Sequence, residues 1–144
     1  MAMQMANSKV RKLIFKPEIR SAKDEVVKHY SEVGKRFVFL DKNNFPDGNV
    51  YMIERVMRGI KKPYEPAKLR SHTVNAIMVF TGFGRLLEGM EVEISLGTKK
   101  HIMETPFVVF VPKNTKHSYK IIRGSGTYQK ILFAPGGDYN KVTS

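Results

Sequence analysis

Histidine side chains are the candidates for chemistry that this sequence presents most plainly. His117 follows an unbroken apolar run over residues 107–111 and a turn marked by Pro112 and Asn114. Because side chains alternate along a strand, His117 shares one face with Tyr119. A neutral imidazole can bind a metal ion, take up a proton or make hydrogen bonds. The chain has four histidines and no cysteine, which excludes a thiol nucleophile and a cysteine-type zinc site.

Short strands must position these side chains. Ser21, as an N-cap, predicts a short helix or turn over residues 22–30. Gly97-Thr98 and Gly124-Ser125-Gly126 predict turns, and Asn114 predicts a residue in the left-handed conformation. The predicted strands are residues 10–15, 35–40, 50–58, 70–80, 90–96, 99–103, 107–111, 118–123 and 127–133.

The order of these elements favours an all-β protein. Short strands separated by turns about every eight to twelve residues, with little helix, are typical of a β-sandwich or β-barrel. The length of 144 residues suits a single domain with a core of its own. No repeat or linker divides the chain.

The charge of the chain is strongly basic, with a formal net charge of +12. This favours attraction to phosphates or other anions, and the alternative explanation is a solvated basic surface. The Lys and Arg residues occur in ones and twos rather than in one stripe, and no nucleic-acid motif is present, so nucleic acid is not the expected partner. No apolar run approaches membrane-helix length and the N-terminus lacks a signal-peptide core, so we expect a cytoplasmic protein without membrane contact.

Two motifs carry a resemblance to a known family. Residues 112–117, from Pro112 to His117, match the second motif of the cupins, with Asn114 in the place of a glycine. Residues 70–76, followed by Gly82, stand in the place of the first motif. The sequence also resembles a group of uncharacterised bacterial cupin-like proteins through Leu96-Gly97 to His101, Phe110 to His117, and Ala134 to Tyr139.

The resemblance implies a fold and a division of the chain. The expected fold is the cupin double-stranded β-helix, a jelly-roll barrel, over residues 46–139. Residues 1–45 would form an N-terminal extension with a strand and a short helix or turn, packed on the barrel or exchanged with a second copy, and residues 140–144 a tail. Because cupins often pair through their sheets, the resemblance also implies a homodimer.

The family's metal site is incomplete in this sequence. Cupins commonly bind a divalent metal such as Fe, Mn, Ni or Zn with three histidines and a glutamate, and by position only His72 and His117 remain. Arg70 replaces the first histidine and Ala76 the glutamate; neither can ligate a metal. Asn75 offers only a weak carbonyl ligand. The resemblance therefore implies a degenerate metal site.

These substitutions lead to a functional hypothesis with alternatives. Arg70, His72, His117 and Tyr119 would point inward, where a guanidinium beside two imidazoles favours a small anionic ligand, with Asn75 nearby. One alternative is a metal-dependent oxygenase or isomerase that takes missing ligands from Glu54 or Asn75. A second is that both histidines are merely hydrogen-bonded in a filled barrel. A third is an interaction protein that acts through its basic surface. We expect His101 on the surface.

Overall fold

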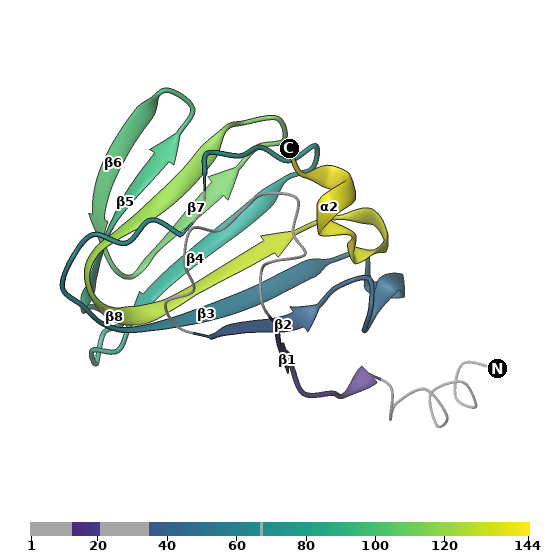
Figure 1. Cartoon of the computed structure of the whole chain (residues 1–144), viewed down its shortest axis with the longest axis horizontal. Coiled ribbons are helices and arrows are strands. Elements are labelled where there is room, and N and C mark those ends of the chain that lie inside the picture. Colours follow the sequence, from purple (N-terminus) through teal and green to yellow (C-terminus); the bar gives the residue numbers. More distant parts are fainter. Residues whose placement is uncertain (1–12, 21–34, 67) are drawn as a thin grey trace.

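The computed structural model describes residues 13–20, 35–66 and 68–144. Strands dominate it, and the described helical segments are short: η2 (Pro46–Gly48), η3 (Pro135–Gly137) and α2 (Tyr139–Val142) (Figure 1). The all-β class predicted from the sequence is confirmed. The strands are β1 (Glu18–Ile19), β2 (Arg36–Leu40), β3 (Tyr51–Ile60), β4 (Ala76–Gly82), β5 (Met90–Leu96), β6 (Lys99–Glu104), β7 (Phe107–Val111) and β8 (His117–Leu132).

Strand β8 joins the two halves of the barrel. Its first half pairs antiparallel with β5, which in turn pairs with β6. Its second half lies between β3 and β4 and pairs antiparallel with both. From there the sheet continues through β2 to β1 on one side and to β7 on the other (Figure 1). β8 therefore contributes side chains to the barrel interior along its whole length.

The turn predicted at Gly124-Ser125-Gly126 is wrong, because β8 runs through it as one continuous strand. Gly124 has a positive φ of 106°, and a Cβ there would lie 2.1 Å from the carbonyl oxygen of Gly89. The glycines instead let β8 bend while it passes close to the neighbouring backbone. Because glycine occurs both in turns and in bends within a strand, the sequence alone does not distinguish a turn from a bend at these positions.

Other strand predictions are corrected at their ends. Residues 14–17 have no regular structure and the first described strand is β1, so the strand predicted over 10–15 is wrong in its described part. Residues 10–12 and the helix predicted over 22–30 lie outside the described residues. The strand predicted over 70–80 begins only at Ala76, because Arg70 and His72 make isolated bridges instead of a ladder.

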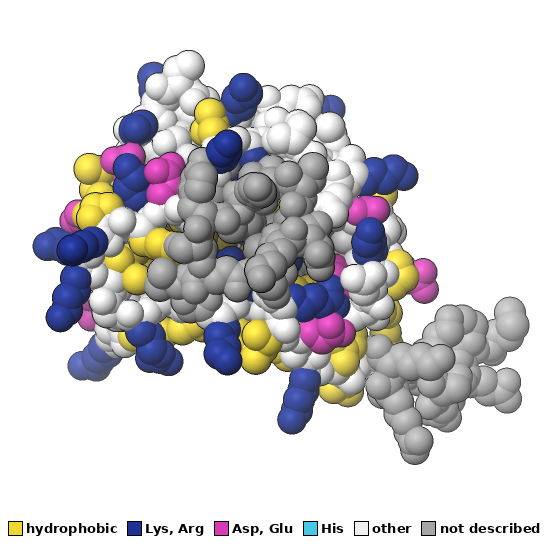
Figure 2. All heavy atoms as spheres, in the orientation of Figure 1, with side chains coloured by type: hydrophobic (Ala, Val, Ile, Leu, Met, Phe, Trp, Pro, Cys, Tyr) yellow, Lys and Arg dark blue, Asp and Glu magenta, His cyan; other side chains and the backbone are white. Residues whose placement is uncertain are grey.

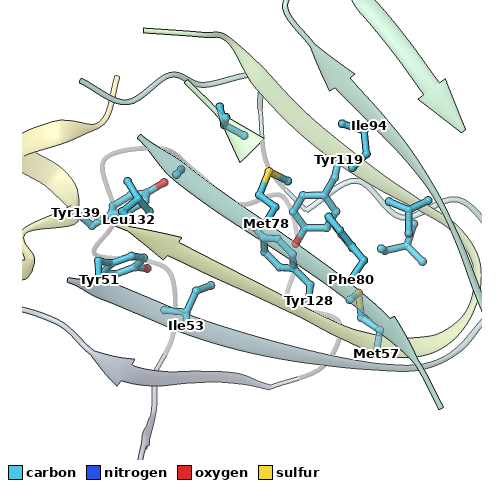
Figure 3. Packing of buried hydrophobic residues seen from close by; sticks show 14 of the residues in the cluster. Tyr51, Ile53, Met57, Met78, Phe80, Ile94, Tyr119, Tyr128, Leu132 and Tyr139 are labelled. Carbon is cyan, nitrogen blue, oxygen red and sulfur yellow. The ribbon is translucent and has the colours of Figure 1, made fainter. Parts of the chain in front are cut away.

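The core follows from side-chain alternation along the strands. Tyr51, Ile53 and Met57 face inward from β3, and Phe80 and Tyr128 meet them from β4 and β8 (Figure 3). The Phe80 and Tyr128 ring centroids are 5.0 Å apart. This aromatic packing lies directly beside buried basic side chains, because Tyr128 on β8 is the strand partner of Arg55 on β3.

Lys and Arg side chains are scattered over the face of the molecule shown in Figure 2 and form no continuous stripe there. This distribution agrees with the scattered basic residues of the sequence. Among the described residues, no helix is long and apolar enough to cross a membrane.

Candidate functional site

The candidate site is a group of basic side chains inside the barrel. Arg55 continues the inward face of β3 that begins with Tyr51 and Ile53, and Lys130 lies directly across from Ile53 on β8. Arg70 reaches the same region through an isolated bridge to His117, in which each backbone N–H donates to the other residue's carbonyl at 3.0 and 2.8 Å. All of these basic side chains are buried.

His117 is held between two partners at the first residue of β8. Its Nδ1 lies 2.9 Å from the carbonyl oxygen of Thr115, and its Nε2 lies 3.0 Å from Nζ of Lys130. A carbonyl oxygen only accepts and an ammonium group only donates. The hydrogen bonds therefore assign a neutral imidazole that donates from Nδ1 and accepts at Nε2.

His72 lies beside His117, with 4.8 Å between the ring centroids. Its Nδ1 is 2.8 Å from Oγ1 of Thr143, a residue that the chain brings back after α2. Its Nε2 is buried and has no hydrogen-bond partner among the described residues. One nitrogen of this imidazole is thus available for a ligand.

Both imidazoles are held neutral by their surroundings. Burial, and then the positive charges of Lys130 and Arg70, lower the pKa of His117 to about 3. Burial and the charge of Lys130 lower the pKa of His72 even further. Burial raises the pKa values of Tyr119 and Tyr128, so their hydroxyl groups remain protonated.

A small cavity lies among the cations. Its volume is about 10 Å³, which is close to the space that one water molecule requires. It is lined by Tyr51, Ile53, Arg55, Arg70, Tyr119, Tyr128, Lys130 and Tyr139. No carboxylate belongs to this lining, so the described walls combine positive charge with tyrosine rings.

Arg55 is the most informative residue of this lining. Its side chain is only 1% exposed, and its Nη1 has no hydrogen-bond partner among the described residues. A buried N–H group of a guanidinium without a partner is costly, and the cost falls when an anion or a polar atom accepts from it. Arg55 therefore points to a ligand.

A second, larger pocket adjoins the first. Its volume is about 200 Å³, and it shares Tyr51 and Tyr139 with the inner cavity. The centroids of these two rings are 4.9 Å apart, so they stand side by side between the two spaces. The outer pocket also contains Arg36, whose Nη2 donates to the Tyr51 hydroxyl at 3.2 Å.

The structure brings together four of the five residues that the sequence singled out. Arg70 and Tyr119 line the cavity, and His72 and His117 are buried beside it. Asn75 lies outside this group: its side chain is exposed and accepts from the backbone N–H of Lys113 at 2.9 Å. Its place in the structure is to hold the turn between β7 and β8.

Sequence reasoning missed Arg55 and Lys130. The available signal was a single cation on an otherwise apolar strand face, between Ile53 and Met57 in one case and between Tyr128 and Leu132 in the other. Glu54, considered as a substitute metal ligand, is on the opposite face and accepts from Nε2 of Gln129 at 2.8 Å. His101 is exposed on β6, as expected.

The residues present do not fit a divalent metal. The Nε2 lone pair of His117, the one that a metal would need, already accepts from the Lys130 ammonium group. The neighbouring Arg55 and Arg70 guanidinium groups would repel a bound cation. No group of three His, Asp or Glu residues that could hold a metal occurs in the described part of the chain.

Comparison with solved structures identifies the fold. The chain aligns with oxalate decarboxylase of Bacillus subtilis with a TM-score of 0.57 and 10% identity, over 91% of this chain and 32% of that one. The chain has a cupin fold. It spans about a third of the length of oxalate decarboxylase.

Two smaller proteins described as cupins also align with this chain. An RmlC-like cupin from Shewanella frigidimarina has a TM-score of 0.48 and 10% identity, over 84% of this chain and 95% of that one. A cupin-like protein from Thermotoga maritima has a TM-score of 0.48 and 14% identity, over 83% and 79%. No protein-family model and no curated protein matches the sequence. At these identities the cupin likeness concerns the fold and assigns no ligand or reaction.

Proposed function

We propose that this cupin-fold protein is a binding protein that holds a small anionic ligand inside its barrel. The observation that carries the proposal is the buried Nη1 of Arg55, which lacks a partner among the described residues and belongs to a cavity also lined by Arg70 and Lys130. Charge-assisted hydrogen bonds to an anion are shorter and stronger than neutral ones. An anion would therefore be stabilised here by charge and by hydrogen bonding together.

The size of the inner cavity limits what enters it. With about 10 Å³, it accepts one water-sized atom, such as a chloride ion or one oxygen of a carboxylate or phosphate group. The uncharged part of a larger ligand would occupy the outer pocket of about 200 Å³ beyond Tyr51 and Tyr139, whose lining includes the carboxylates of Asp41 and Asp138. The ligand class is therefore a small anion whose charged end reaches Arg55.

The two histidines contribute hydrogen bonding and not charge to the proposed site. Both are neutral, so they add no charge of their own. The free Nε2 of His72 can donate one hydrogen bond if its proton is on that nitrogen. His117 keeps Lys130 in place through the 3.0 Å contact.

The proposal is tested by anion-dependent thermal stability of the wild type and of Arg55→Met. A ligand that binds only the folded state raises the melting temperature with its concentration. We expect sodium acetate, phosphate or chloride, compared at equal ionic strength, to raise the melting temperature of the wild type by several degrees and that of Arg55→Met by much less. Calorimetric titration of the same anions should give heats only with the wild type.

Arg123→Met is the matched control, because Arg123 lies on β8 but is exposed and paired with Glu91 at 3.3 Å. It should respond to anions like the wild type. Equal responses of Arg55→Met and the wild type would show that the anions act on the surface and would end the proposal.

A metal-dependent enzyme is the second candidate, favoured only by the free Nε2 of His72 next to His117. Elemental analysis after exposure to Fe, Mn, Ni and Zn, with His117→Ala for comparison, separates the two candidates. Stoichiometric metal in the wild type and none in His117→Ala would favour the enzyme.

A further inference from the structure

Tyr139 stands between the inner cavity and the outer pocket. It is the first residue of α2, its side chain is buried, and it lines both spaces together with Tyr51. The centroids of the two rings are 4.9 Å apart, and both residues lie at the same end of the core (Figure 3). A continuous space from Arg55 to the outer pocket therefore requires one of the two rings to move.

The two rings are attached to the fold in different ways. Tyr51 belongs to β3, which is paired on both sides by β2 and β8, and its hydroxyl accepts from Nη2 of Arg36 at 3.2 Å. Tyr139 belongs to the C-terminal segment, residues 138–144, which contains the short helix α2 and no strand. Because a side chain on a fully paired strand is harder to move, Tyr139 is the ring that a long ligand would displace.

The backbone that follows Tyr139 is anchored to the segment that leads into β4. The backbone N–H of Thr73 donates to the carbonyl oxygen of Val142 at 2.8 Å. Ser71 and Ser144 exchange both of their backbone hydrogen bonds, at 2.8 and 2.9 Å. These bonds hold the C-terminal segment in place, so the Tyr139 ring closes the passage between the two spaces in the ligand-free protein.

We propose that Tyr139 selects anions by size. An anion confined to the inner cavity, such as chloride, reaches Arg55 with the ring in place, whereas a carboxylate whose body extends into the outer pocket has to displace it. Displacement separates the ring from Tyr51 and from His72, whose ring centroid is 5.7 Å away. Exposing a buried aromatic ring weakens binding by roughly tenfold or more. This inference rests on the proposed anion binding and adds the residue that limits the length of the ligand.

The test compares chloride with benzoate, by calorimetric titration of the wild type and of Tyr139→Ala at equal ionic strength. Benzoate carries its carboxylate on a ring that resembles the deleted phenol, so this ring can fill the space that the variant opens while the carboxylate reaches Arg55. The readout is the ratio of chloride affinity to benzoate affinity, which a loss of stability alone would not change. We expect this ratio to fall by at least about tenfold in Tyr139→Ala.

Phe107→Ala is the matched control. Phe107 also packs its ring against the core, stacked on Phe80 with 4.8 Å between the centroids, but it lines neither the inner cavity nor the outer pocket. This variant should be less stable and should keep the affinity ratio of the wild type. An unchanged ratio in Tyr139→Ala, or an equal fall in Phe107→Ala, would overturn the size selection and leave anion binding in place. A wild type that binds neither anion would end both proposals.

Circular dichroism checks that Tyr139→Ala is folded. If it is not, Tyr139→Leu decides the question, because leucine keeps an apolar contact with Tyr51 and is shorter than the phenol ring. A fall of the affinity ratio by at least about threefold in Tyr139→Leu supports the size selection. An unchanged ratio in this variant contradicts it.

Discussion

Among the single residues of this cupin-fold protein, Lys130 affects the chemistry of both buried histidines. The ammonium group of Lys130 lies beside His117, in the position that a bound metal ion would need. It donates a hydrogen bond to Nε2 of His117. The charge of Lys130 also lowers the pKa values of His72 and His117. One lysine thus changes the chemistry available to two histidines.

This arrangement predicts that stability falls in acid. In the unfolded chain an imidazole binds a proton below about pH 6.5, whereas folded His117 stays neutral down to about pH 3. Between these values the unfolded state binds more protons, so lowering the pH favours unfolding. Lowering the pH from 7 to 5 should reduce the free energy of unfolding by about 2 kcal/mol for each of His72 and His117.

Denaturant unfolding of His117→Gln at pH 7 and pH 5 measures this contribution. Between pH 7 and pH 5 the free energy of unfolding of the variant should fall by about 2 kcal/mol less than that of the wild type. His101→Gln, at an exposed position on β6, serves as the control and should behave like the wild type. The same acid loss in all three proteins would show that His117 is not held neutral.

Among the elements, β8 decides the geometry of the site. It supplies His117 at its start and Lys130 near its end, and the two side chains meet only because the strand bends between them at Gly124. At Gly124 the chain needs both a positive φ of 106° and space, since a Cβ would lie 2.1 Å from the Gly89 oxygen. Glycine alone satisfies both conditions.

Gly124→Ala should therefore destabilise the protein by more than about 2 kcal/mol, because a left-handed alanine is strained and its methyl group meets backbone. Gly136→Ala is the matched control: Gly136 also has a positive φ, of 66°, but no atom of the described residues lies within 4 Å of the place that a Cβ would take. Gly136→Ala should lower the free energy of unfolding by only about 1 kcal/mol. Thermal or denaturant unfolding of the two variants separates steric contact from backbone strain, and equal losses would contradict the close approach at Gly124.

In the molecule as a whole, positive charge is spread over the surface. The formal net charge is +12, and Lys and Arg are scattered over the face seen in Figure 2. Exposed cations are screened by salt within about a Debye length, whereas buried cations are screened much less. The buried cations inside the barrel are therefore the ones that can hold an anion at physiological salt.

Local sequence patterns were enough to predict most strands and part of the site. Alternation predicted β5, and the turn at Gly97-Thr98 predicted its hairpin partner β6. Pro112 ended β7 at Val111, and Asn114 adopts the predicted left-handed conformation with φ of 64°. These features depend on a few neighbouring residues, so a short window of sequence contains them. The cupin resemblance correctly anticipated the fold. Arg70, His72 and His117, which it placed on inward positions, are buried, and their role in binding stays a prediction.

The remaining features arise only when distant strands pair. Lys130 and His117 are 13 residues apart, and Arg55 and Arg70 come from other segments, so their common cavity depends on how β3 and β8 pair. A sequence shows which side chains share a face of one strand. Only the pairing of distant strands determines which faces meet, because the backbone groups that form the hydrogen bonds between strands are the same in nearly all residues and do not specify a partner.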